Sequence, residues 1–122
     1  MAEEPQGRVY NRNGKPLSQV EVETMIGNDI ELLEKATNAY EAALEREAHS
    51  VARYKRDYAS AFLNAAGAKY IKEATADLEC DTQLTERLVV EAEVKALREH
   101  LWTIRTRLEG LRSLNANIRV QV

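Results

Sequence analysis

The sequence predicts an all-α protein: a long antiparallel two-helix hairpin of the coiled-coil type that dimerises into a four-helix bundle, with a short non-helical N-terminal arm. Two observations predict this fold class. Both prolines, Pro5 and Pro16, lie in the first 16 of the 122 residues, and helix-forming residues dominate the rest. Apolar residues also recur at steps of four and three along two long stretches, which is typical of coiled-coil helices.

The N-terminal arm is expected over residues 1–18, and the helical hairpin domain over residues 19–122. Within the arm, Asn13-Gly14 favours a tight turn, so the arm is either extended or a small hairpin. The opening MAEEPQGRVY has no apolar central region, so no secretory signal is expected.

The first long helix is expected to begin near residue 19 or near residue 28 and to end near residue 66. Ser18 and Glu21 form an S-x-x-E capping box, which favours the earlier start. Gly67 is typical of the residue that follows a helix. The expected contact face of this helix contains Ile26, Ile30, Leu33, Thr37, Tyr40, Leu44, Glu47, Val51, Tyr54, Tyr58, Ala61 and Ala65.

The second long helix is expected from about residue 70 to about residue 117, after a turn at about residues 67–70. Its heptad pattern is strongest from Val90 onward. The expected contact face contains Cys80, Gln83, Arg87, Val90, Val94, Leu97, Leu101, Ile104, Leu108, Leu111, Asn115 and Ile118.

Charge along the chain supports an antiparallel arrangement. Residues 21–47 hold eight acids and two bases, and residues 95–119 hold six bases and two acids. Residues 48–70 hold four bases and one acid, and residues 71–94 hold seven acids and two bases. A reversal of direction near Gly67 therefore places each segment beside one of opposite net charge.

Heptad positions that flank the contact face predict specific charge pairs. Such exposed pairs contribute little stability, but they select the register. One register pairs Glu41 with Arg105, Glu34 with Arg112 and Lys55 with Glu91. A shift of one heptad instead pairs Glu41 with Arg98 and Glu34 with Arg105, and loses the lysine pair.

Several large apolar residues lie off the expected contact face, which predicts further partners. A second copy or a different protein would cover them. Trp102 lies between Arg98 and Arg105 in the sequence and is the preferred interface anchor. Leu88 and Leu114 are expected to belong to the same interface. The off-face residues are Leu32, Phe62, Leu63, Leu88, Val89, Trp102 and Leu114.

The sequence shows no pattern of a catalytic or cofactor site, so a non-enzymatic protein without cofactor, metal or small-molecule substrate is expected. His49 and His100 lack metal-ligand spacing, and the five glycines form no phosphate loop. Cys80 is the single cysteine, which fits a reducing compartment, so we expect a cytoplasmic protein. No run of 18 apolar residues occurs, so no membrane partner is expected.

An alternative function is nucleic-acid binding. The net charge of −3 gives no overall attraction to phosphates. A stripe of arginines near the C-terminus could nevertheless contact them. These arginines are Arg98, Arg105, Arg107, Arg112 and Arg119.

The stretch ALREHLWTIRTRLEGLRSLNANIR, residues 96–119, resembles the last helix of small helical proteins encoded by bacteriophages of actinobacteria. The shared pattern is Ala96-Leu97-Arg98, Arg105-Thr106-Arg107 and Arg112-Ser113-Leu114. The resemblance covers about residues 28–119. It implies a protein of the infected host's cytoplasm that either binds a host or phage protein or assists phage DNA replication or recombination. We expect the first: a self-associating protein that binds a protein partner through a helix face.

Overall fold

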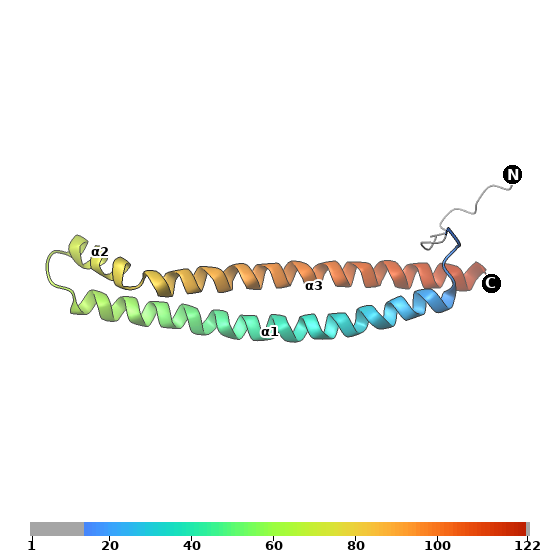
Figure 1. Cartoon of the computed structure of the whole chain (residues 1–122), viewed down its shortest axis with the longest axis horizontal. Coiled ribbons are helices and arrows are strands. Elements are labelled where there is room, and N and C mark those ends of the chain that lie inside the picture. The colour runs from blue at the N-terminus through green and yellow to red at the C-terminus, as the bar shows by residue number, and fades with distance from the viewer. Residues whose placement is uncertain (1–13, 122) are drawn as a thin grey trace. The chain divides into compact units, whose positions relative to one another are not determined.

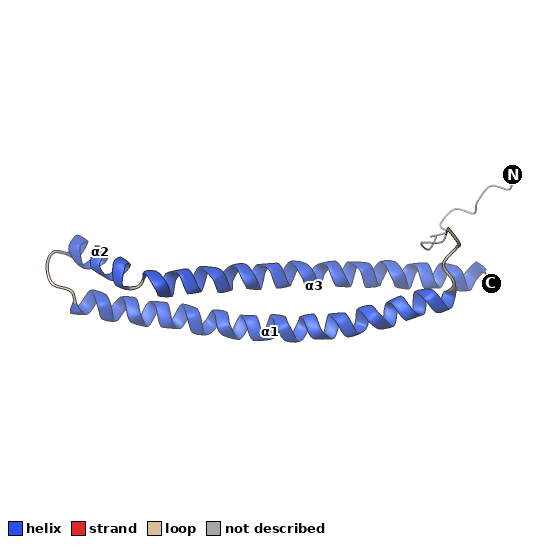
Figure 2. Ribbon diagram, viewed as in Figure 1, coloured by secondary structure: helices blue, strands red, loops and turns tan. Residues whose placement is uncertain are grey.

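The computed structural model describes residues 14–121 and, at the C-terminal end, side chains up to Val120. Its elements follow in the order α1 (Gln19–Asn64), α2 (Lys69–Glu79) and α3 (Asp81–Gln121), as Figure 1 shows. All three elements are α-helices (Figure 2), so the predicted all-α class is confirmed. The turn expected at Asn13-Gly14 lies mostly outside the described residues.

The start of α1 is set by the predicted capping box. The backbone N–H of Glu21 donates to Ser18 Oγ at 3.2 Å, and the N–H of Val22 donates to the Ser18 carbonyl at 3.1 Å. These bonds satisfy N–H groups that have no partner inside the helix. The helix begins at Gln19 and continues through Gly27, so the later of the two expected starts is not used.

A turn follows α1 at the predicted glycine. Gly67 has φ +110°, and a Cβ at this position would lie 3.3 Å from Ile71 Cγ2. Only glycine adopts this conformation without strain. The turn then leads into α2, whose first residue is Lys69.

The second long helix was predicted as one element, but the structure divides it at Cys80. Cys80 has φ −102° and ψ 13°, outside the helical range. Its N–H still donates to the Ala76 carbonyl at 2.9 Å, and its carbonyl accepts from Leu84 N–H at 2.9 Å. Asp81 then opens α3, where a negative charge favours a helix N-terminus.

The contacts divide the chain into two compact units. We call residues 14–36 and 100–121 the terminal unit, and residues 37–99 the turn unit. α1 and α3 each contribute residues to both units.

The core of the terminal unit is built from large aliphatic side chains. Val22 and Ile104 are almost completely buried. Leu101, Leu108 and Leu111, which lie near Ile104 in the sequence, are also buried. These α3 residues belong to the contact face predicted for the second helix.

The core of the turn unit contains smaller side chains. Ala61, Ala76 and Cys80 form a buried cluster, which brings α2 close to the end of α1. Three aromatic residues pack around this cluster because the small side chains leave room for their rings. They are Tyr54, Tyr58 and Phe62.

The contact face of α1 differs from the prediction at every second position, where the residue before the predicted one is buried instead. Ile30 and Leu44, expected inside, are 46% and 37% exposed. The buried residues lie one position earlier and recur every seven residues. They are Val22, Asp29, Ala36, Ala43 and Ser50. Mostly small residues fill these inner positions, so the larger aliphatic residues lie at the edge of the contact face.

Candidate protein-interaction surface

Within the turn unit, hydrogen bonds and ion pairs connect α1 with α3. Arg46 pairs with Glu93, and Arg53 Nη1 donates to Glu86 Oε2 at 2.9 Å. Higher residue numbers on α1 therefore meet lower numbers on α3, which is an antiparallel order within this unit.

Tyr40 and Arg98 add a third connection in the turn unit. Arg98 Nε donates to Tyr40 Oη at 3.2 Å, and this hydrogen bond raises the pKa of Arg98. The guanidinium thus remains charged and is held against α1.

The terminal unit contains the most buried ion pair. Arg107 Nε and Nη2 donate to the two carboxylate oxygens of Asp29 at 2.6 and 2.9 Å. Asp29 is 8% exposed, so both of its carboxylate oxygens are satisfied by this two-point contact. The hydrogen bond with Asp29 raises the pKa of Arg107. Arg119 Nη2 also donates to Glu23 Oε1 at 3.2 Å, again in antiparallel order.

The predicted charge pairs differ from those in the structure. Among residues 14–121, neither Glu34–Arg112 nor Lys55–Glu91 is an ion pair. Because Arg53 pairs with Glu86, Lys55 lies level with residue 84 rather than with residue 91. This offset corresponds to the register shifted by one heptad.

Glu41 and Arg105 belong to different units, so their pairing stays a prediction.

The arginines considered for nucleic-acid contact divide into two groups. Arg98, Arg107 and Arg119 are bonded to side chains of α1. Arg105 and Arg112 are exposed. Within the part of the chain that the structure describes, neither takes part in a hydrogen bond or ion pair with another residue.

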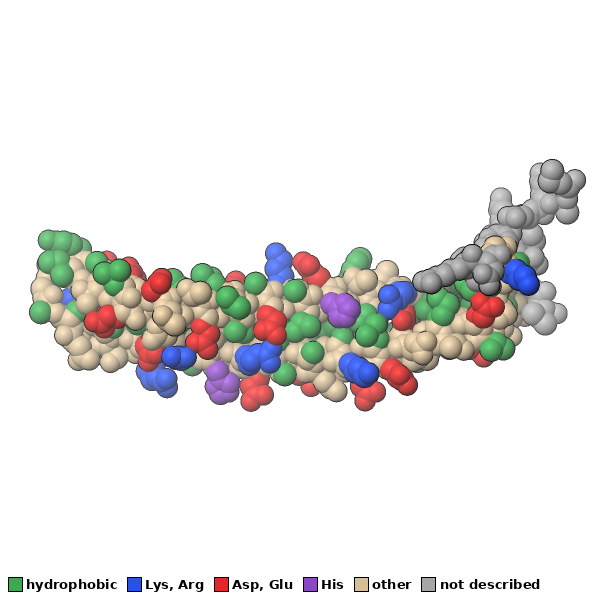
Figure 3. Space-filling view, viewed as in Figure 1, with side chains coloured by type: hydrophobic (Ala, Val, Ile, Leu, Met, Phe, Trp, Pro, Cys, Tyr) green, Lys and Arg blue, Asp and Glu red, His purple; other side chains and the backbone are tan. Residues whose placement is uncertain are grey.

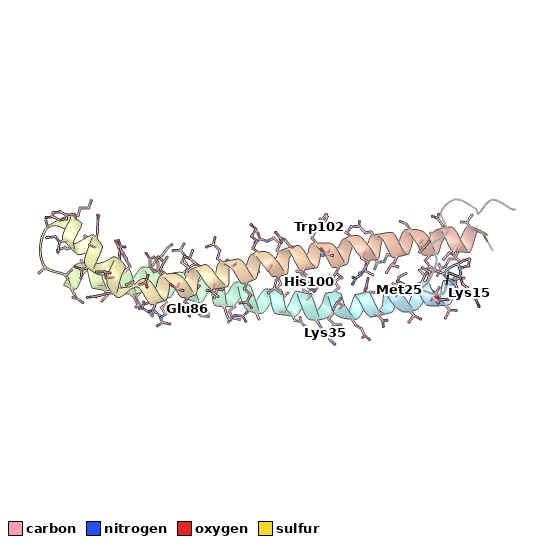
Figure 4. The ribbon with its side chains drawn as sticks, turned by 45° about the horizontal axis from the view of Figure 1, so that its top comes forward. Lys15, Met25, Lys35, Glu86, His100 and Trp102 are labelled. Atoms are coloured by element: carbon pink, nitrogen blue, oxygen red, sulfur yellow. The ribbon has the colours of Figure 1, made fainter. Side chains whose placement is uncertain are left out.

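Two of the three predicted interface residues are prominent on α3. Trp102 is 69% exposed, and Figure 4 shows its side chain on the surface of α3. Leu88 is 55% exposed, and its neighbour Val89 is 62% exposed. Leu88 and Trp102 are 14 residues apart, so they occupy the same heptad position. We call Trp102 and Arg105, which are both exposed in the terminal unit, the outer face of α3.

Leu114 does not belong to this outer face. It is half-buried, and it follows Trp102 by 12 residues, which places it about 120° around the helix. Its place in a protein interface stays a prediction. Its hydrophobicity reflects partial burial beside the contact face.

The apolar surface near the turn was only partly predicted. Leu63 was recognised, but Tyr70 and Leu78 are also exposed, by 73% and 81%. Apolar side chains are visible at this end of the turn unit in Figure 3. The overlooked signal is the spacing of Tyr70, Ala74 and Leu78, which places them on one side of α2.

A groove of about 450 Å³ lies within the turn unit. Val51 and Val94 supply apolar walls from α1 and α3. Charged residues line the remainder, with three cations and two anions. They are Arg87, Lys95, Arg98, Glu47 and Glu91.

Reactive and metal-binding groups are sparse in the described part. Within residues 14–121, no group of three or more His, Cys, Asp or Glu side chains is placed to hold a metal ion. Cys80 is 2% exposed. Burial raises the pKa of its thiol, and nearby Asp57 adds to this effect. No helix among these residues has the length and apolar character that crossing a membrane requires.

Comparison with known proteins identifies no relative that would indicate a role for the candidate interaction surface. No protein-family model, no curated protein sequence and no solved structure matches this chain. We therefore infer the function from the outer face of α3, the groove and the charge pairs.

Proposed function

We propose that this chain is a non-enzymatic interaction protein. It folds as an antiparallel helical hairpin, self-associates as a dimer with a four-helix core, and binds a different protein through the outer face of α3. Following the resemblance of residues 96–119, the partner is a host or phage protein in the cytoplasm of an infected cell.

The exposure of Trp102 is the observation that supports this proposal most. Trp102 is 69% exposed, whereas Leu101 and Ile104 on the same helix are only 4% and 1% exposed. Isolated exposed apolar residues are common, but tryptophan is enriched among residues that dominate binding energy. Arg105 lies one turn away and offers hydrogen bonds at the rim.

Self-association is supported by the width of the apolar face of α1. Beside the buried line of Val22 and Ala43 runs a half-exposed line that includes Ile30, Leu44 and Val51. A helix with three apolar positions per heptad is suited to contact two neighbours rather than one.

Nucleic-acid binding is less well supported than protein binding. Three of the five candidate arginines already bond to side chains of α1. Using them for phosphates would require breaking those contacts, including the two-point contact of Arg107 with Asp29.

The test is affinity capture from host lysate followed by mass spectrometry. Wild type should retain a specific protein that a Trp102→Ala variant loses. Leu63→Ala is the control, since Leu63 is 75% exposed but lies on α1. Equal capture by wild type and the Trp102→Ala variant would exclude the outer face of α3 as the binding surface.

A further inference from the structure

The groove in the turn unit has a cationic rim at fixed positions. Arg98 is held by its 3.2 Å hydrogen bond to Tyr40, and the guanidinium of Arg87 lies 5.5 Å from the centre of the Tyr54 ring. Lys95 also lines the groove and is exposed. Around the apolar walls formed by Val51 and Val94, these three cations outnumber the two anions of the lining, Glu47 and Glu91. An occupant that combines apolar and acidic side chains on one helix face would therefore fit.

The same unit carries a helix face of that kind. On α1, Glu41, Leu44, Ala48 and Val51 follow one another at steps of three and four residues, so they form one stripe along the helix. Glu41 is exposed, Leu44 is 37% exposed and Val51 is half-buried. This stripe borders the groove, because Val51 belongs to both.

We propose that a second copy of this chain occupies the groove and presents this α1 stripe to it, around a two-fold axis parallel to the helices. The inference rests on the self-association proposed above and identifies its surface. Under two-fold symmetry the same contact forms twice, with α1 of each copy against α3 of the other.

The register within the turn unit determines which residues would meet. Arg53 pairs with Glu86 and Tyr40 with Arg98, so each residue of α1 has a defined level on α3. A two-fold axis parallel to the helices leaves each residue at the same height along the helix direction in both copies. Glu41 of one copy then lies level with Arg98 of the other, where Lys95, one turn away, is also within reach.

The apolar members of the two stripes meet by the same reasoning. Val51 of one copy lies level with Leu88 of the other, and Leu88 is 55% exposed. Leu44 lies level with Lys95, whose aliphatic stem can cover it. The contact therefore combines apolar burial with charge complementarity, and Trp102 in the terminal unit remains for a different protein partner.

Sedimentation equilibrium of the full chain tests this surface. Wild type should be dimeric at tens of micromolar, and Glu41→Lys or Lys95→Glu should each raise the dimer Kd roughly tenfold, because every substitution affects two symmetric contacts. The combined variant, Glu41→Lys with Lys95→Glu, should recover most of the lost affinity. Ala42→Lys is the control, since Ala42 is exposed and lies about 160° around α1 from Leu44; its Kd should equal that of wild type.

The outcomes separate the two proposals. A wild-type chain that is strictly monomeric would overturn both self-association and this surface. A wild-type dimer whose Kd does not respond to Glu41→Lys or Lys95→Glu would overturn the surface alone. Failure of the combined variant to recover affinity would overturn the pairing of these two residues across the interface.

Discussion

Substituting Ala43 by leucine tests the rotation of the α1 contact face. Ala43 is 0% exposed, so the three added carbon atoms must displace packed neighbours. Overpacking of this kind costs about 1–3 kcal/mol. For a chain of this length, each kcal/mol lowers Tm by about 4 °C. Thermal unfolding followed by circular dichroism should therefore show a fall of about 4–12 °C.

The adjacent alanine provides the control. Ala42 is exposed in the same helix, and its replacement by leucine should change stability by less than about 0.5 kcal/mol. The heptad pattern read from the sequence places Leu44 inside and both alanines outside, so it predicts no difference between the two variants. Equal Tm values for Ala43→Leu and Ala42→Leu would refute the packing described for α1.

The buried ion pair, the buried thiol and the partly buried phenol, and the exposed arginines of α3 can each be tested. The decrease in Tm caused by Arg107→Ala should be several times the decrease caused by Arg119→Ala, because Arg107→Ala leaves the Asp29 carboxylate, which is 8% exposed, without its two-point contact. Equal decreases in thermal unfolding would contradict the burial of this pair. Burial raises the pKa of Cys80 and the pKa of Tyr58 above their ordinary values. Their contribution to stability is therefore complete below those ordinary values, about 8.5 and 10, and is lost as pH rises through the folded-state values. The urea concentration at the unfolding midpoint should therefore decrease as the pH rises above 9, and Cys80→Ala should remove the part of this decrease that occurs at the lower pH. A midpoint concentration that stays constant up to pH 10 would contradict this. Finally, a gel-shift assay at low salt should show no DNA complex, whereas a complex whose affinity falls steeply with salt would favour phosphate binding by Arg105 and Arg112.

The sequence predicts the contact face of α3 well because large aliphatic side chains occupy it. Val94, Leu101, Ile104, Leu108 and Leu111 are all buried, as their spacing predicts. Such residues contribute about 1.5–3 kcal/mol each when fully buried, so their position dominates the choice of face.

The face of α1 is harder to predict because its buried residues carry little hydrophobic signal. Ala36, Ala43 and Ser50 fill inner positions, and a pattern search instead selects the larger Leu44 beside them. Asp29 is also inside, since Arg107 from α3 compensates its charge. That compensation depends on a residue far along the chain, so it leaves no local signal.

The candidate interaction surface was predicted in part for similar reasons. Trp102 and Leu88 were identified because they lie off the strong α3 pattern, and both are exposed. Leu114 was grouped with them because hydrophobicity alone does not report the angular position around a helix. The break at Cys80 also escaped notice, since no proline or glycine marks it.

The most direct test of the antiparallel pairing is a distance measurement in the terminal unit. Spin labels at Asn28→Cys and Arg112→Cys, in a Cys80→Ala background, report the separation of α1 and α3, and both positions are exposed. Since packed helix axes lie about 8–10 Å apart, pulsed electron resonance should give a distance below about 25 Å. This distance should persist when labelled chains are diluted with unlabelled ones. A continuous helix would separate the labels by more than about 100 Å, and that result, or loss of the short distance on dilution, would contradict pairing within one chain.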